Sequence, residues 1–242
     1  MSARSDIVRT VEFEAEISMP SSTVENYLKQ LYLQQQHAPE ELVSMGKLAS
    51  AMGVVPGTAT TMVKALADSG LVTYQSRGGV KLTSGGEQLA LHVLRRHRLV
   101  ELFLVKVLGL DWSEVHVEAD ELEHAISDKV LERIDHLLGR PSVDPHGDPI
   151  PTAKGKLATP HLQSLADCEL AKPFRIARVV DQGASFLQFL DRCGLTPGVL
   201  VKVDSRDSAA DAVQIRPHGR AVVTLGTSAA TKILVEDDKV TR

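Results

Sequence analysis

Apolar residues recur at helical spacing near the start of the chain. Leu31 lies three positions after Leu28 and four after Tyr27, the spacing that places side chains on one buried face of a helix. Ser22 and Glu25 precede this stripe at the spacing of a capping box, in which each side chain satisfies an end group of the first turn. The pattern therefore predicts a helix that begins at Ser22.

The next segment has the pattern of a helix-turn-helix. Two short apolar-periodic stretches, residues 43–53 and 58–67, lie close together, and Gly53 stands where the turn between them favours a positive φ. Residues 70–83 then read as two short strands joined by a turn. Helix-turn-helix plus hairpin is a winged helix, which typically binds DNA. A three-helix module that only binds other proteins would show the same pattern.

The remainder of the chain predicts two further units. Residues 85–151 contain long helical stripes, and this surface is more apolar than the helices can bury alone, which favours a homodimer. After a polar stretch come five short apolar strands, at residues 174–180, 200–203, 212–215, 221–225 and 231–235, separated by Gly, Pro and Asp turns. The predicted fold class is mainly α with β: a winged helix-turn-helix, a helical domain and a small β-barrel.

Composition narrows the class without choosing a function. The net charge of −4 argues against non-specific coating of nucleic acid but allows sequence-specific binding. Cys168 and Cys193 are isolated, so neither a disulfide nor a zinc site is expected. We expect a cytoplasmic protein with no membrane partner, because no apolar run reaches the ~18 residues of a membrane span. The acidic residues of the N-terminal segment also differ from a signal peptide.

The exposed side of the second short helix carries candidate DNA contacts. Hydroxyls and threonine methyl groups suit base edges, whereas cationic side chains on the helix and on the wing suit phosphate or the minor groove. The residues expected to contact DNA are Thr58, Thr60, Thr61, Lys64 and Arg77. An ordinary solvated first turn would also be rich in Ser and Thr.

Histidines and carboxylates gather between residues 97 and 124. His97 and Glu101 are four positions apart, and a second set has relative offsets of zero, four, seven and eight. At ~3.6 residues per turn these offsets fall on one side of a helix. The second set is His116, Asp120, Glu123 and His124. Imidazole plus carboxylate without thiolate suits Mn²⁺ or Fe²⁺, although a solvated helix face would show the same residues.

The order of these units resembles the diphtheria toxin repressor and manganese transport regulator family. The most specific motifs are residues 96–101 (RHRLVE), 109–111 (GLD), 115–120 (VHVEAD), 123–128 (EHAISD) and 148–151 (DPIP). The resemblance covers about residues 20–236. It implies a metal-dependent, homodimeric regulator, usually a repressor, that controls metal homeostasis, binds a palindromic operator and has a C-terminal Src-homology-like barrel. It also implies no enzymatic activity, and no nucleophile motif or phosphate-binding glycine loop argues otherwise.

The resemblance implies two metal sites. The primary site would comprise Asn26, Asp120, Glu123 and His124; the ancillary site would comprise His97, Glu101 and His116, with Gln182 and Ser185 from the barrel. The iron-dependent branch has Met and Cys at the positions of Asn26 and Asp120, whereas the manganese branch has Asp and Glu there. Oxygen in place of sulfur favours Mn²⁺, with Fe²⁺ as the alternative. Lys29 stands where the manganese branch has a further acidic residue, which argues against a two-metal primary centre.

The implied domains are an N-terminal arm (1–19), a winged-helix DNA-binding domain (20–84), a helical metal-binding and dimerisation domain (85–151), a linker (152–168) and a small β-barrel domain (169–236). A metal ion that joins Asn26 to the helical domain would fix the angle between the two domains and so the spacing of the dimer's recognition helices. Two alternatives remain: a winged-helix regulator that responds to an organic ligand, and a metal-dependent hydrolase.

Overall fold

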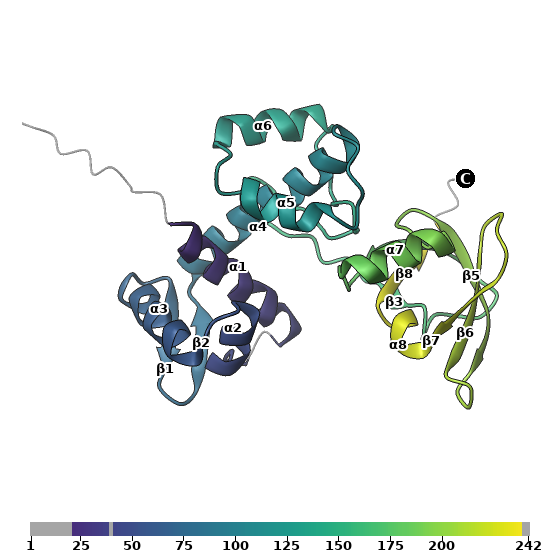
Figure 1. Ribbon diagram of the computed structural model, residues 1–242, viewed down its shortest axis with the longest axis horizontal. Helices are drawn as coiled ribbons and strands as arrows, with labels where there is room; N and C mark the ends of the chain where they lie inside the picture. Colours follow the sequence, from purple (N-terminus) through teal and green to yellow (C-terminus); the bar gives the residue numbers. More distant parts are fainter. Residues whose placement is uncertain (1–20, 39–40, 239–242) are drawn as a thin grey trace, which may run out of the picture.

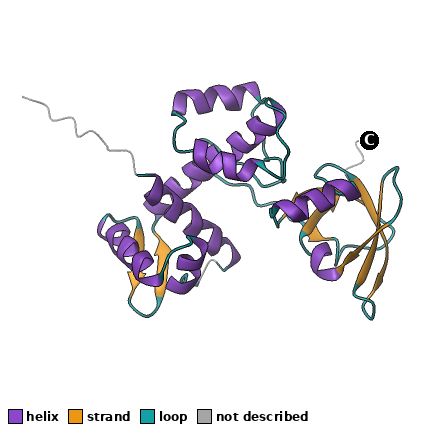
Figure 2. Ribbon diagram, in the orientation of Figure 1, coloured by secondary structure: helices purple, strands orange, loops and turns teal. Residues whose placement is uncertain are grey.

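The computed structural model describes residues 21–38 and 41–238, so the expected N-terminal arm (1–19) lies outside the described residues. The chain forms a helical N-terminal region with a small hairpin, a helical middle region, and a β-rich C-terminal region (Figures 1 and 2). In the described part of the chain, no helix has the length and apolar character needed to cross a membrane.

The N-terminal domain is a winged helix. Its elements are α1 (Ser22–His37), α2 (Met45–Ala51), α3 (Pro56–Asp68), β1 (Val72–Gln75) and β2 (Gly79–Leu82). Helices α2 and α3 form the expected helix-turn-helix, and β1 pairs antiparallel with β2 to make the wing. Helix α1 begins at Ser22 as expected, but the expected capping residue was wrong: Ser21, rather than Ser22, caps the helix by accepting a hydrogen bond from the Val24 amide. Glu25 is therefore free for other contacts.

The middle domain is built on one long helix. Its elements are α4 (Ser84–Lys106), α5 (Val115–Leu122) and α6 (Asp128–Leu137). Helix α4 packs against α1 of the winged helix and also against α5 and α6. Ser127 caps α6 by accepting a hydrogen bond from the Val130 amide. The predicted helix for the second donor set is shorter than expected, since α5 ends at Leu122 and His124 lies in the following turn.

The C-terminal domain is a strongly curved antiparallel sheet with two short helices. Its elements are β3 (Gln163–Ser164), β4 (Pro173–Val179), α7 (Ala184–Cys193), β5 (Leu200–Asp207), β6 (Ala212–Pro217), β7 (Val223–Gly226), α8 (Thr227–Ala230) and β8 (Ile233–Asp237). The strand order is β3-β8-β4-β5-β6-β7. All five expected strands are present; β3, which falls inside the expected linker, and both helices were not expected.

Each domain has its own apolar core, and a polar layer lies between them. The N-terminal core contains Leu28, Leu48 and Val63, and the C-terminal core centres on Phe174 and Ile215. Between these cores, the middle of α4 buries a run of charged residues rather than apolar ones. Buried charges are stable only when partners satisfy them, so this polar layer is the place to look for function.

Candidate metal centre

The middle of α4 carries the buried polar run. Arg96, His97, Arg98 and Glu101 are between 1% and 4% exposed. Because they occupy successive positions around one helix, their side chains point toward α1, toward α5 and toward the loop that precedes the barrel. Helix α4 therefore places polar groups of three regions within reach of one another.

The expected ancillary donors of the helical domain come together. His97 Nε2 lies 2.9 Å from Glu101 Oε1 and 3.0 Å from His116 Nδ1. His116 Nδ1 lies 3.1 Å from the same Glu101 oxygen. Glu101 is buried and His116 is exposed, so this group opens to solvent on one side only. Two imidazoles around one carboxylate are a donor set that suits a divalent cation.

The expected primary donors lie on the other side of His97. His97 Nδ1 is 2.7 Å from Glu123 Oε2 and 3.1 Å from Asp120 Oδ1. The Lys29 ammonium of α1 also reaches these carboxylates, at 2.8 Å from Asp120 Oδ1 and 2.6 Å from Glu123 Oε1. The remaining two members meet each other, with His124 Nε2 3.0 Å from Asn26 Oδ1. All four expected residues thus share one neighbourhood at the α1–α5 boundary.

A buried ion pair beside this group was not expected. Glu25 Oε1 accepts a hydrogen bond from Arg96 Nη1 at 3.2 Å, and Glu25 Oε2 lies 2.5 Å from His124 Nδ1. The Arg96 guanidinium also reaches Asp128 at 3.2 Å. The sequence reading assigned Glu25 to a capping box, and that assignment concealed its link from α1 to α4. The position of Glu25, directly before the expected metal ligand Asn26, was the sequence feature that could have indicated this link.

A third donor group lies toward the barrel and consists of Glu101, Asp144 and His146, all buried. His146 Nε2 donates a hydrogen bond to the Trp112 carbonyl oxygen at 2.8 Å. Because Nε2 donates in this bond, Nδ1 is the ring nitrogen that is left to accept a hydrogen bond or to bind a cation. His146 Nδ1 lies 3.9 Å from Glu101 Oε2, and neither atom has a hydrogen-bond partner among the described residues. The sequence around His146, rich in proline and glycine, is typical of a turn and gives no sign that the ring is buried.

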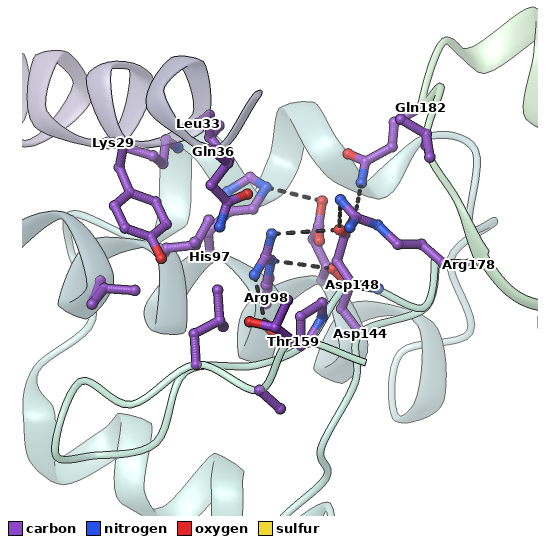
Figure 3. Close-up of a pocket in the computed structure, with 18 of the residues that line it drawn as sticks. Lys29, Leu33, Gln36, His97, Arg98, Asp144, Asp148, Thr159, Arg178 and Gln182 are labelled. Atoms are coloured by element: carbon purple, nitrogen blue, oxygen red, sulfur yellow. Dashed lines mark hydrogen bonds and ion pairs between the residues drawn. The ribbon is translucent and has the colours of Figure 1, made fainter. Parts of the chain in front are cut away.

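The loop at residues 144–149 also joins the helical domain to the barrel. Asp148 pairs with Arg98 at 3.5 Å and with Arg178 of β4, and it accepts a hydrogen bond from Gln182 Nε2 at 2.7 Å. These residues lie at one end of a cavity of about 930 Å³ between α1, α4 and residues 155–162 (Figure 3). Gly147 packs so close to the Ala177 carbonyl oxygen that a Cβ would overlap it.

The two barrel residues expected as ligands are therefore placed differently. Gln182 lines the cavity, and its amide nitrogen contacts Asp148, whereas Ser185 is exposed in the first turn of α7 and does not line the cavity. The structure brings Gln182, but not Ser185, to the polar layer. Gln182 contacts the loop that carries His146 and does not contact the histidines directly.

Burial and charge set the protonation of the polar layer. Burial lowers the pKa of His97, but the Glu101 charge and hydrogen bonds with three carboxylates raise it well above its ordinary value. Burial raises the pKa of Asp120, but hydrogen bonds with His97 and Lys29 and their charges bring it well below its ordinary value. Burial and the charges of Asp148 and Glu101 raise the pKa of Asp144 well above its ordinary value. A cation that binds His97 or Asp144 must displace a proton, whereas Asp120 offers an ionised carboxylate.

The residues present fit a divalent cation. The donors are imidazole nitrogens and carboxylate or amide oxygens, with no sulfur atom among them. The buried Glu101 Oε2 and His146 Nδ1 lack hydrogen-bond partners within the described chain, which is costly unless a ligand or water satisfies them. A cation at Glu101 and His146 would satisfy both atoms.

The expected DNA contacts lie on one domain. Thr58, Thr61 and Lys64 are exposed on α3, and Thr60 is half-buried. The Thr60 and Thr61 hydroxyls donate to the carbonyl oxygens of Pro56 and Gly57 one turn earlier, which leaves their methyl groups and lone pairs toward solvent. Arg77 is exposed at the tip of the wing. The arrangement has the form of a recognition helix beside a wing.

A winged helix joined to a helical domain with clustered metal donors and a C-terminal curved sheet defines a class of modular regulators, and sequence comparisons agree. Residues 19–80 match the family described as iron dependent repressor, N-terminal DNA binding domain. Residues 83–152 match iron dependent repressor, metal binding and dimerisation domain, and residues 163–237 match the FeoA domain.

The sequence is also similar to individual proteins of this family. The iron-dependent repressor IdeR of Mycobacterium tuberculosis is 35% identical over 129 residues, which are 53% of this chain and 55% of IdeR. The regulator MntR of Lysinibacillus sphaericus is 32% identical over 120 residues, 50% of this chain and 84% of MntR. The chain belongs to the diphtheria toxin repressor and manganese transport regulator family. The match spans only about half the length of IdeR.

Solved structures extend the likeness to the whole fold. A manganese-dependent transcriptional repressor in complex with manganese has a TM-score of 0.80 and 38% identity, covering 88% of this chain and 99% of that one. ScaR with bound Cd²⁺ has a TM-score of 0.72 and 32% identity, covering 88% and 99%. The three-part fold predicted from the sequence is confirmed.

Proposed function

We propose that this protein is a metal-dependent transcriptional regulator, a repressor in its usual action, that controls metal homeostasis and binds operator DNA in response to Mn²⁺, with Fe²⁺ as the alternative. One observation carries the proposal. Candidate donors for a cation come from both sides of a domain boundary, with Asn26 on α1 and Glu123 and His124 at the end of α5. A ligand that contacts both domains favours one angle between them.

The residues of the boundary have separable roles. When bound, a divalent cation supplies positive charge that draws oxygen and nitrogen donors together. Asn26 and His124 hold α1 against the turn after α5. His97 joins the carboxylates on one side to Glu101 on the other, since its two ring nitrogens contact different groups. Without these links, the winged helix would adopt several orientations relative to the helical domain, and DNA binding would have to select one of them.

The donor chemistry supports Mn²⁺ over Fe²⁺. The candidate ligands offer oxygen and imidazole nitrogen, and softer sulfur donors that would favour Fe²⁺ are absent from these groups of described residues. The relatives point both ways: IdeR is named as iron-dependent, whereas the structural relative with a TM-score of 0.80 is named as manganese-dependent. We give Mn²⁺ the priority because of the oxygen donors Asn26 and Asp120.

A homodimer on a palindromic operator completes the proposal. The helical domain exposes apolar side chains that the rest of the described chain does not cover: Val107, Leu108, Val117, Leu122, Val130 and Leu137. Such a surface fits a second copy of the chain. Two recognition helices would then read two half-sites. Because its target is DNA, we place the regulator in the cytoplasm, and we assign it no catalytic activity.

A mobility-shift titration tests this function. DNA fragments selected from a random pool by the Mn²⁺-treated protein are titrated with and without Mn²⁺ or Fe²⁺. We expect metal to tighten binding at least about tenfold, the low end of allosteric coupling. His124→Ala should abolish the metal response but remain dimeric, and His136→Ala, an exposed residue of α6, is the matched control. Equal affinity with and without metal would refute the proposal.

A further inference from the structure

Lys29 occupies an unusual place for a lysine. It lies on α1, is only 5% exposed, and its ammonium contacts two carboxylates of the helical domain, Asp120 at 2.8 Å and Glu123 at 2.6 Å. Removing a lysine from water is costly unless its charge is paired. Lys29 meets this condition by pairing with carboxylates across the domain boundary, and Figure 3 shows it at the edge of the same cavity as His97.

The charges around Lys29 are balanced within the protein. Glu25 is paired with Arg96 and His124, whereas Asp120 and Glu123 are paired with Lys29 and His97. A divalent cation that binds both Asp120 Oδ1 and Glu123 Oε1 would have to displace the ammonium from its two contacts or lie beside it, and like charges at such distances repel strongly. The Asp120–Glu123 pair therefore already has its cation.

We infer that Lys29 is a built-in cation that takes the place of one metal ion at the α1–α5 boundary. It holds the winged helix to the helical domain when no metal is present, and it restricts added metal on this side to the neighbouring donors Asn26, Glu123 and His124. The regulatory role of this pairing rests on the proposed function. In a metal-dependent regulator, the ion pairs of Lys29 would determine how much of the metal-free protein already holds the winged helix in the orientation that binds DNA.

The test compares variants of the full chain in a chelator and after dialysis against MnCl₂. Lys29→Met removes the charge and keeps the approximate length, Lys29→Arg keeps the charge, and Lys106→Met changes an exposed lysine in the last turn of α4 as the matched control. In chelator, we expect Lys29→Met to lower Tm by about 5 °C or more and to speed hydrogen exchange in α1 and α5. Lys29→Arg should restore most of both.

The ion count gives an independent readout. Lys29→Glu replaces the ammonium with a carboxylate, so we expect it to bind one more Mn²⁺ per chain than the unsubstituted protein, measured by elemental analysis after dialysis. Lys29→Met should bind Mn²⁺ about tenfold more tightly, because a competing positive charge is gone. The ion count of Lys29→Glu decides the matter even if Lys29→Met fails to fold without metal.

Opposite results are easily recognised. If Lys29→Glu binds the same number of Mn²⁺ ions as the unsubstituted protein, or if a folded Lys29→Met matches Lys106→Met in Tm, hydrogen exchange and Mn²⁺ affinity, the inference is overturned. These measurements use no DNA. A protein that lacks Mn²⁺-stimulated DNA binding but shows the predicted metal-free difference would refute the proposed function and leave the Lys29 bridge established.

Discussion

The two sides of α4 differ in whether their buried polar atoms have partners within the protein. Toward α1, the carboxylates of Glu25, Asp120 and Glu123 each have a cationic partner supplied by the protein. Toward the barrel, Glu101 Oε2 and His146 Nδ1 are buried without hydrogen-bond partners in the described residues. A cation gains most where buried donor atoms have no hydrogen-bond partner within the protein. The comparison teaches that domain coupling and metal capture need not depend on the same residues.

The largest expected effect is at the residue that belongs to both donor groups of the barrel side. Glu101 contacts His97 at 2.9 Å, His116 at 3.1 Å and His146 at 3.9 Å. Glu101→Gln should weaken Mn²⁺ binding by about 100-fold, because it removes the one negative charge that these imidazoles share. Calorimetric titration measures the change. Glu118→Gln, on the exposed face of α5, should bind like the unsubstituted protein.

A smaller effect is expected where the barrel docks. Asp148→Asn removes the carboxylate that Arg98 and Arg178 share, although Arg98 keeps Asp144 at 3.6 Å. We therefore expect a loss of about 2 kcal/mol in unfolding free energy. Small-angle scattering should show a larger radius of gyration as the barrel separates. Asp191→Asn, exposed on α7, serves as control. An unchanged radius would mean that other contacts, such as the packing of Trp112 against the barrel core, are enough to hold the barrel.

His146 offers a more selective change on the same side. His146→Ala removes a buried nitrogen with no hydrogen-bond partner in the described chain, and we expect Mn²⁺ affinity to fall about tenfold. The metal-free contacts between α1 and α5 do not involve His146, so hydrogen exchange there should not change. If His146→Ala binds Mn²⁺ normally, the unpartnered atoms on the barrel side of α4 do not form a metal site, and the difference between the two sides has no bearing on metal binding.

The smallest expected effect lies far from α4, on the recognition helix. Lys64→Ala should weaken DNA binding a few-fold and reduce the slope of log affinity against log salt by about 1, as the loss of one phosphate contact does. Lys129→Ala, exposed on α6, is the matched control. Equal salt slopes for the two variants would remove Lys64 from the DNA surface.

The sequence predicted the parts of the structure that depend on local periodicity. The helix-turn-helix, the wing and the five strands follow from apolar spacing, and Ser127 at the start of α6 follows from capping chemistry. The offsets of His116, Asp120 and Glu123 likewise predicted one shared face. These features could be predicted because each is decided by residues within one or two turns of each other.

Contacts between distant segments were the part that could not be predicted. Glu25 fits a capping box equally well as a link to Arg96, which lies 71 positions further along the chain. His146 lies in a sequence rich in proline and glycine, and only the packing of the loop against Trp112 reveals that its ring is buried. Periodicity carries no information on such distances. The ligand assignments, including those of Gln182 and Ser185, stay predictions.

The continuity of α4 has a mechanical consequence. At ~1.5 Å per residue, its 23 residues form a rod of about 35 Å that begins beside the wing and ends in the helical domain. A tilt of roughly 3° about the middle of a rod of this length moves each end by about 1 Å. The polar layer lies at the middle of this helix. A small rearrangement of its side chains that tilts the helix there would move both ends at the same time. In the proposed regulator, α4 would act as a lever arm, and its stiffness would determine how far a change at its middle moves its two ends.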